Sequence, residues 1–427
     1  MLDRRHKPIV CPTLIDQNTE IQVLPMKNPS ILIVAAGPLQ MPLIQAAKRQ
    51  DLRIVAVDAD PAAPGLQVAD AAHVIALDDL DAILEVAERA RVAAVSSLCT
   101  DFAVRAVAHV AGRLHLPGIT CEAAGNATDK RRMRRRFAQA GAPSIPFREV
   151  DEVDSAIAAA RDLGYPVALK TPRSAGSRGI FRVDCDEQMR ERFPAARRYE
   201  TAGALLVESW MEGPEVSVEG CCFEGQVHIV QITDKLVYGG AFPVESGHTQ
   251  GSRFPAAVQR SVRDCAVSGI RALQLDNCGF HAEIKVCADV PRIVEIAARL
   301  GGDRIATHLT PLSTGVDLVG AILDISLGRS PDVQPKWTRG SAIRYFNAGR
   351  CGVITAIRGL EDIPKMPGFE LMVVGADGGK PLQPGFRVPA VQSSLDRYGY
   401  SIFSGSGAAE AADRADRAVQ LTFEFAS

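Results

Sequence analysis

Residues 30–118 alternate short apolar runs with amphipathic stretches, and this alternation constrains the fold more than any other feature of the chain. The runs SILIVAAG and RIVAVDAD flank the amphipathic stretch MPLIQAAKRQ, and a second unit follows as AILEVAERA and VAAVSSL. Strands that are apolar throughout, with amphipathic helices between them, are typical of a parallel sheet covered by helices on both faces. We therefore expect a doubly wound domain over 30–118, after an N-terminal tail at 1–29.

The pattern changes after residue 118 to mixed helices and antiparallel strands. Ala123 to Ala140 and SAIAAARDLG are predicted helices that end at proline or glycine. The runs LLVESWM, EVSVEGCCF and QVHIVQI mix polar with apolar residues, which favours antiparallel strands. HAEIKV and PRIVEIAA predict a hairpin that turns near Ala288 and Asp289. A linker rich in proline and glycine near 328–340 precedes the last region, so the expected fold class is a multidomain α/β and α+β protein.

The composition limits the kind of protein. A chain of 427 residues is too long for one core, and 47% hydrophobic with 23% charged residues is an ordinary globular composition. The formal net charge of −2 gives no overall field to attract nucleic acid or an anionic membrane. Ten cysteines without a CxxC pair fit reduced thiols, and no apolar run reaches the roughly 18 residues of a membrane span. We expect a cytoplasmic protein that binds neither nucleic acid nor membrane.

Lys170 ends an apolar run, YPVALK, that predicts a buried strand. A buried ammonium group is costly unless an anion meets it. The loop after it contains Ser174, Gly176, Ser177 and Gly179, small residues that let backbone N–H groups approach a phosphate. The loop is not a P-loop, because the chain has no GxxxxGK motif. The alternative is a flexible hairpin whose lysine reaches water.

A second lysine, Lys130, lies in TDKRRMRRRF, where six basic residues fall within seven positions. Thr128 and Asp129 predict an N-cap directly before it. Lys130 would then lie at a helix start, where the helix dipole favours phosphate. For most of the arginines in this run we expect a solvated helix face.

Two glutamates interrupt the apolar strands of the predicted hairpin. Glu283 and Glu295 lie on opposite arms, and two converging buried carboxylates with no equally buried lysine between them favour Mg²⁺. The alternative is a pair of glutamates on an exposed sheet face. Arg299 follows just before Gly301 and Gly302, where a guanidinium could neutralise charge on a phosphoryl group in transfer.

Other candidates are weaker when taken alone. Glu208 and Glu215 flank a turn that starts at Met211 and is by default a hairpin. The loop VESGHTQ supplies Glu245 and His248, although a lone loop histidine is more often incidental than catalytic. AAGPLQMP and SIFSGSGAAEAADRADRAV lack a complete dinucleotide fingerprint, so a nicotinamide cofactor is not expected.

In this order, the segments resemble the ATP-grasp superfamily over nearly the whole chain from about residue 30. The resemblance implies a Rossmann-like N-terminal domain, a two-lobed ATP-grasp centre and a C-terminal α+β domain. The expected bounds are 30–118 for the first domain, 119–205 and 206–330 for the two lobes, and 331–427 for the last domain.

The resemblance also implies roles for the candidate residues. Lys130 and Lys170 would contact the phosphates of ATP, and the loop 174–179 would close over them. The backbone around Glu208 and Met211 would pair with adenine, and Glu215 would bind the ribose hydroxyls. The remaining expectations are that Glu283 and Glu295 bind Mg²⁺ or Mn²⁺, that Arg299 is the catalytic arginine, and that Gly301 and Gly302 border the substrate.

Several motifs are similar to one branch, the L-amino acid α-ligases and their carnosine-synthase-like relatives. They are GPLQMPLIQAAK, TDK at 233–235, ESGH at 245–248, HAEIK at 281–285, EIAARLGGD, CGVITAIRGLEDIP and DRYGYSIFSG. In that branch Glu245 would hold the substrate ammonium and His248 would lie beside the reacting carboxyl group, where His248 or Arg299 could stabilise the oxyanion. Ala297 stands where many relatives have a metal-binding asparagine, which leaves the second metal's coordination open.

The resemblance implies an ATP-dependent ligase that joins amino acids through an acyl phosphate and releases ADP and phosphate. Its partners would be small amino acid substrates, and relatives of this kind are often homodimers. The alternatives are another ATP-grasp ligase, a bicarbonate-using carboxylase of the purine-pathway type, or a nucleotide-binding protein that has lost catalysis. The sequence does not identify which carboxylate and which amine are joined.

Overall fold

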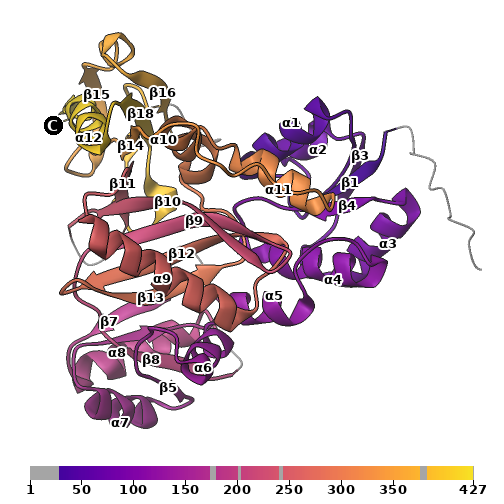
Figure 1. Ribbon diagram of the computed structural model, residues 1–427. Helices are drawn as coiled ribbons and strands as arrows, with labels where there is room; N and C mark the ends of the chain where they lie inside the picture. The colour runs from indigo at the N-terminus through magenta and orange to yellow at the C-terminus, as the bar shows by residue number, and fades with distance from the viewer. Residues whose placement is uncertain (1–27, 174–178, 201–202, 240–243, 376–381, 427) are drawn as a thin grey trace, which may run out of the picture.

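The computed structural model describes residues 28–173, 179–200, 203–239, 244–375 and 382–426 (Figure 1). Almost all of the expected tail at 1–29 lies outside these residues, as do Ser174, Gly176 and Ser177 of the expected phosphate loop. Figure 1 shows a central sheet with the indigo N-terminal region to its right, residues 147–209 below it and the yellow C-terminal region above it.

The N-terminal region contains a parallel four-stranded sheet in the order β3-β2-β1-β4, as the sequence predicts. The strands are β1 (Ser30–Val34), β2 (Arg53–Asp58), β3 (Ala71–Val74) and β4 (Ala94–Ser96). The helices are α1 (Met41–Arg49), α2 (Pro64–Val68), α3 (Leu80–Ala90) and α4 (Val104–Leu114).

Both faces of this sheet are covered because side chains alternate along each strand. On β1, Leu32 and Val34 pack against α3 and α4. Ile31 and Ile33 face the other way, toward α1 and toward α11 (Leu318–Ser326), which comes from much later in the chain. Figure 1 shows the orange α11 beside the indigo region. This packing attaches the N-terminal region to the centre of the molecule.

A second sheet, in the order β5-β8-β6-β7, forms the first lobe, and all its neighbouring strands are antiparallel. The strands are β5 (Phe147–Val150), β6 (Val167–Lys170), β7 (Ile180–Val183) and β8 (Leu205–Ser209). The helices α7 (Val153–Leu163) and α8 (Asp186–Arg197) pack on it. The run LLVESWM contains β8, and this strand is antiparallel to both of its neighbours, as the sequence predicts. The expected lobe boundary at 205/206 falls inside this strand.

The predicted helix at 123–140 is two helices, α5 (Cys121–Thr128) and α6 (Lys130–Ala140). Asp129 separates them in an extended conformation and caps α6, since its carboxylate accepts hydrogen bonds from the backbone N–H groups of Arg131 and Arg132. The N-cap was predicted, but the break that it imposes on the preceding helix was not.

The central sheet has eight strands in the order β13-β12-β9-β10-β11-β14-β18-β16, with every neighbouring pair antiparallel. The first five in the chain are β9 (Glu215–Phe223), β10 (Gln226–Val237), β11 (Glu245–Gln250), β12 (Cys278–Cys287) and β13 (Val290–Ala297). The helix α9 (Ala256–Leu273) covers one face. The predicted hairpin is present as β12 and β13, and Glu283 lies directly opposite Glu295.

The C-terminal region continues this central sheet. It contributes β14 (Gly340–Tyr345), β16 (Phe369–Val374) and β18 (Gly399–Gly405), with α12 (Ala408–Ala418) packed on them. A small sheet holds β15 (Gly352–Arg358), β17 (Arg387–Val388) and β19 (Thr422–Phe425). Between the centre and this region lie a π-helical turn (Ile305–Leu309) and α10 (Thr310–Thr314). No single described helix is long and apolar enough to cross a bilayer, although the bent run Ile305–Thr314 with α11 passes that test by length and composition.

Candidate active site

A cavity of about 1170 Å³, its open mouth included, lies between the first lobe, the central sheet and the N-terminal region. We call it the main cavity. It brings together nine of the predicted site residues: Lys130, Lys170, Glu208, Met211, Glu215, Glu245, Glu283, Glu295 and Arg299. A second cavity adjoins it and contains His248 and Gly302. Residues predicted from distant segments therefore converge on one region.

Lys170 has an anionic partner within the protein. Its Nζ lies 2.7 Å from Oε2 of Glu208, a fully buried carboxylate on the neighbouring strand β8. Arg134 donates from Nε to Oε1 of the same carboxylate at 2.6 Å. Burial alone would raise the pKa of Glu208, but the two cations lower it to about 2. Glu208 therefore stays ionised and fixes Lys170 at the cavity wall.

Arg134 corrects the prediction for the basic run that starts at Lys130. Its side chain is buried, and besides Glu208 it donates hydrogen bonds to the backbone carbonyls of Ile293 and Val294 on β13. A solvated helix face describes Arg132 and Arg135, which are exposed, but not this residue. Arg134 ties α6 and the first lobe to the hairpin that carries Glu295.

Lys235 occupies the centre of a carboxylate cluster that includes Glu283, so this predicted metal ligand has a buried lysine partner that was not predicted from the sequence. Its Nζ lies 2.6 Å from Glu215, 2.9 Å from Glu283 and 3.3 Å from Glu245. Burial would lower the pKa of Lys235, but the three carboxylates raise it well above its ordinary value. One ammonium group faces three carboxylates, so the cluster retains negative charge that attracts further cations.

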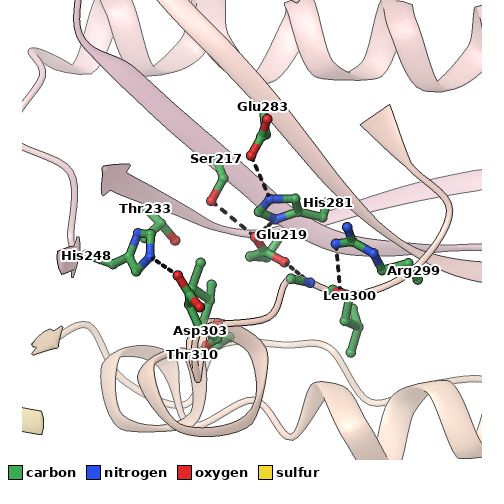
Figure 2. Close-up of polar contacts among 12 residues, drawn as sticks. Ser217, Glu219, Thr233, His248, His281, Glu283, Arg299, Leu300, Asp303 and Thr310 are labelled. Atoms are coloured by element: carbon green, nitrogen blue, oxygen red, sulfur yellow. Dashed lines mark hydrogen bonds and ion pairs between the residues drawn. The ribbon is translucent and has the colours of Figure 1, made fainter. Parts of the chain in front are cut away.

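His281 and Glu219 form a buried pair beside this cluster (Figure 2). His281 Nδ1 lies 2.5 Å from Glu219, and its Nε2 lies 3.6 Å from Glu283. Burial would lower the pKa of His281, but Glu219 raises it to about 9. The backbone N–H of Gly301 donates to Glu219, and a Cβ at Gly301 would lie only 2.7 Å from the imidazole. Close packing therefore favours glycine at position 301, while its expected place beside the substrate stays a prediction.

Arg299 projects into both cavities and is held from the N-terminal region. Asp101 accepts hydrogen bonds from Arg299 Nε at 3.1 Å and from Nη2 at 2.8 Å. Burial would raise the pKa of Asp101, but Arg299 lowers it, so the pair is ionic. Arg299 also donates to the carbonyl of Leu300, as Figure 2 shows. The guanidinium is therefore oriented before any ligand binds.

His248 faces the second cavity, where its Nε2 donates a hydrogen bond to the Asp303 carboxylate at 3.0 Å. Arg397, from the C-terminal region, donates to both Asp303 oxygens at 2.8 and 2.6 Å. Burial would raise the pKa of Asp303, but Arg397 lowers it well below its ordinary value. Arg397 also lies 4.0 Å from Glu245, so one arginine connects both predicted substrate residues.

The site contains residues that the sequence reading missed. The omitted partners are Asp101, Arg134, Glu219, Lys235 as a buried charge, Asp303 and Arg397. Glu219 offered one usable signal, since a glutamate inside the strand EVSVEGCCF must find a partner when buried. Lys235 lies close in sequence to Glu215 and Glu245 and within the TDK motif, but its burial among carboxylates was not predicted. Asp101, Arg134, Asp303 and Arg397 are joined to their partners across more than 50 positions, and no local pattern marks such pairs.

The carboxylate pair fits a hydrated divalent cation. Glu283 and Glu295 are cross-strand neighbours, and both line the main cavity. Mg²⁺ is usually held by one or two carboxylates, with water and substrate phosphates completing its shell. Among the described residues no group of three or more histidine, cysteine, aspartate or glutamate side chains forms a metal site. Lys130 pairs with Glu295 at 3.0 Å, so each of the two carboxylates has a lysine partner.

Gly179 and Met211 have clear local roles. Gly179 has a φ of +67°, and a Cβ there would lie 2.6 Å from Thr171 Oγ1, so the end of the expected phosphate loop requires glycine. Met211 is buried in the main cavity wall, next to Trp210. The segment from Glu208 to Glu215 connects the two sheets, so it is not the hairpin of the default reading.

Three family models match the chain in sequence order. They are the PylC-like N-terminal domain at 31–120, the ATP-grasp domain at 163–307 and the L-amino acid ligase C-terminal domain 2 at 344–422. The ATP-grasp match contains the lysine and carboxylate positions of the main cavity from Lys170 to Arg299.

Individual relatives are distant. Alanine–anticapsin ligase of Bacillus subtilis (strain 168) is 26% identical over 280 residues, which cover 60% of this chain and 58% of that protein. Formate-dependent phosphoribosylglycinamide formyltransferase of Synechococcus sp. (strain RCC307) is 26% identical over 405 residues, covering 92% and 96%. The crystal structure of an L-amino acid ligase from Bacillus licheniformis has a TM-score of 0.78 at 19% identity, covering 94% and 100%.

The structural likeness shows a shared fold, and the family models agree with it in the order of the segments. The chain spans less than two thirds of the length of the anticapsin ligase that it matches. An ATP-grasp domain lies at its centre and is flanked on both sides by regions that match models of associated domains. The chain therefore contains an ATP-grasp domain, as the resemblance seen in the sequence predicts.

Proposed function

We propose that the protein is an ATP-dependent ligase that joins the carboxylate of one amino acid to the amine of another. The observation that carries this proposal is the junction of the two cavities. Glu283, Arg299 and Lys235 line both of them, so a nucleotide in the main cavity and an amino acid in the second would meet there. The C-terminal match to an L-amino acid ligase domain supports amino acids as substrates.

Lys130 and Lys170 would bind the phosphates of ATP. Both ammonium groups lie at the wall of the main cavity, and each is oriented by a carboxylate, Glu295 and Glu208 respectively. Glu283 and Glu295 would hold Mg²⁺, which supplies charge neutralisation at phosphate oxygens when bound. The adenine contact near Met211, the ribose contact of Glu215 and the phosphate contacts of Ser174, Gly176, Ser177 and Gly179 stay predictions.

Arg299 would stabilise the negative oxygens that develop during transfer. In the first step a carboxylate oxygen of one amino acid bonds to the γ-phosphorus, the bond to the ADP oxygen breaks, and an acyl phosphate results. In the second step the amine of the other amino acid attacks the acyl carbon, phosphate leaves with the bonding electrons, and the amine releases its proton. Glu245 would hold an ammonium group and His248 would lie beside the reacting carboxyl.

A second candidate is a ligase of the purine-pathway type. The match to the formate-dependent formyltransferase runs over nearly the full length of both chains, which favours it. Such an enzyme would use formate or bicarbonate as its acid. Turnover of ATP that depends on either acid, and not on an amino acid pair, would select this candidate.

The test is a screen of amino acid pairs with purified full-length protein, Mg²⁺ and ATP, with phosphate release as the readout and mass spectrometry on the products. We expect ADP, phosphate and an amide only when a suitable pair is present. Lys170→Ala should lose turnover, whereas Lys336→Ala, an exposed lysine far along the chain, should keep the wild-type rate. AMP with pyrophosphate, or full activity in Lys170→Ala, would refute the proposal.

The cytoplasmic location and the homodimer also stay predictions.

A further inference from the structure

The second cavity has an unusual rim of exposed apolar side chains. Leu39, Phe102 and Leu395 line it, and their exposed fractions are 36%, 59% and 82%. They come from three distant segments, two in the N-terminal region and one in the C-terminal region. Large apolar side chains left in water at one place commonly mark a binding surface. We call these three residues the apolar rim.

Each rim residue is the middle residue of a three-residue 3₁₀ turn. The turns are η1 (Pro38–Gln40), η2 (Asp101–Ala103) and η5 (Ser394–Asp396). The same local structure therefore presents one apolar side chain to the cavity in each of three separate segments of the chain.

A neighbouring polar residue fixes each turn. Gln40 is buried and donates to the Leu98 carbonyl at 2.5 Å, and Asp101 holds Arg299. Asp396 accepts a hydrogen bond from the Ser393 backbone at 2.7 Å, and the next residue, Arg397, binds Asp303. These anchors position the turns without help from the apolar side chains. The rim residues are thus preorganised, yet they do not contribute to a core.

Other residues that line the second cavity are charged. Glu245 and Asp303 supply carboxylates, and Arg299 supplies a guanidinium. A ligand that satisfies both parts has a charged end with ammonium and carboxylate groups and a bulky apolar end. An amino acid with a large hydrocarbon side chain has this chemistry.

We propose that the apolar rim binds the side chain of an amino acid substrate and makes the enzyme prefer large apolar residues such as leucine or phenylalanine. This proposal rests on the proposed function, because it names the class of substrate at the same site. Removing a branched or aromatic side chain from contact with such a rim lowers affinity in proportion to the apolar area lost.

The test compares leucine with alanine as the varied substrate, against the best partner from the pair screen. Wild type should use leucine with the higher kcat/KM. Leu395→Ser and Leu39→Ser should each lower the leucine-to-alanine ratio by about tenfold, mainly through KM. Val290→Ser is the matched control, since Val290 is 49% exposed at the start of β13 and lies outside both cavities. An unchanged ratio in both rim variants, or a wild-type preference for alanine, would overturn the proposal.

A binding measurement separates this proposal from the proposed function. Calorimetry with leucine, Mg²⁺ and a non-hydrolysable ATP analogue should show binding that Leu395→Ser weakens about tenfold. If no amino acid pair releases phosphate but leucine binds in this way, the ligase proposal fails, while binding of a large apolar side chain at the apolar rim stands. If phosphate is released only with small or charged amino acids, the rim proposal fails alone. A second copy of the chain could also cover the apolar rim, and size-exclusion chromatography tests this. Rim variants that change the oligomeric state but not leucine binding would identify a contact between copies and overturn the proposal.

Discussion

At the scale of single residues, the site depends on charges that are buried and paired. Glu208 shows this most clearly, because it is fully buried between Arg134 and Lys170. Removing one member of such a group leaves the others as uncompensated charges away from water. The arrangement holds Lys170 in place, so the stability of the folded protein and the geometry of the main cavity are linked.

Glu208→Gln should therefore lower the free energy of unfolding by roughly 3–5 kcal/mol at pH 7. The folded-state pKa of Glu208 is about 2 and its ordinary value is 4.5, so the charge contributes fully above pH 4.5 and its contribution is lost as the pH falls toward 2. The difference between wild type and variant should shrink between pH 5 and pH 3.5. Urea unfolding at pH 7, 5 and 3.5 measures it, with the exposed Glu212→Gln as control. A difference that stays constant with pH would contradict the assignment.

Much of the residue set could be predicted from the sequence, because a charge inside an apolar strand is a local signal. Lys170, Glu283 and Glu295 were found in this way. Their partners could not be found, since Asp101 and Arg299 are separated by 198 positions and nothing local indicates that they meet. The loop 174–178 stays a prediction outside the described residues.

At the scale of elements, β9 and β10 approach each other closely at a glycine. Gly220 faces an irregularity in the β10 register, and a Cβ there would lie 2.0 Å from the His228 carbonyl oxygen. Backbone cannot move aside easily at this distance. Glu219 directly precedes Gly220 and pairs with Gln231 on the other side of this irregularity, so the close approach also positions the partner of His281.

Gly220→Ala should destabilise the protein by about 2 kcal/mol or more, because the added methyl group clashes with backbone in the central sheet. Gly112→Ala offers the opposite case: it lies in the helix α4 at an exposed position, and the nearest atom to its Cβ is 4.0 Å away. Alanine there should stabilise by about 0.5–1 kcal/mol. Denaturant unfolding measures the free energy of unfolding of both variants. Equal values would contradict the predicted clash between a Cβ at position 220 and the backbone of β10.

The sequence predicts the type of most elements, but it predicts less well which strands pair with one another. The hairpin of β12 and β13 follows from two apolar runs with a short turn between them, and the parallel sheet follows from the alternation in 30–118. The expected lobe boundary at 205/206 falls inside β8, because the pattern of that run indicates a strand but not the sheet that it joins. The split at Asp129 was missed because both flanking helices have good helical composition.

At the scale of the whole molecule, the flanking regions reach into the central site. Asp101 extends from the N-terminal region to Arg299, and Arg397 extends from the C-terminal region to Asp303. The C-terminal strands also continue the central sheet, so no gap in the sheet separates that region from the site. The order of the regions could be predicted from the family resemblance, but this continuity has no signature in the linker near 328–340.

Asp101→Asn should lower kcat by roughly ten- to a hundredfold, because the guanidinium of Arg299 loses the charge that orients it. The apparent affinity for ATP should stay near the wild-type value, since Asp101 would contact Arg299 and not the nucleotide. Steady-state phosphate release with the best amino acid pair measures both quantities. The control is Asp81→Asn, an aspartate with a side chain 90% exposed in the same region. A normal kcat would show that the N-terminal region does not position Arg299 for the reaction.

The central claim is that this cavity activates an amino acid carboxylate by transferring the γ-phosphoryl group of ATP to it. The most direct measurement uses an amino acid with both carboxylate oxygens labelled as ¹⁸O and analyses the released phosphate by ³¹P NMR. The account predicts ADP and one ¹⁸O atom in the phosphate for each amide formed, because the acyl phosphate carries a carboxylate oxygen to phosphorus. Unlabelled phosphate, or label in AMP with pyrophosphate as the other product, would contradict it.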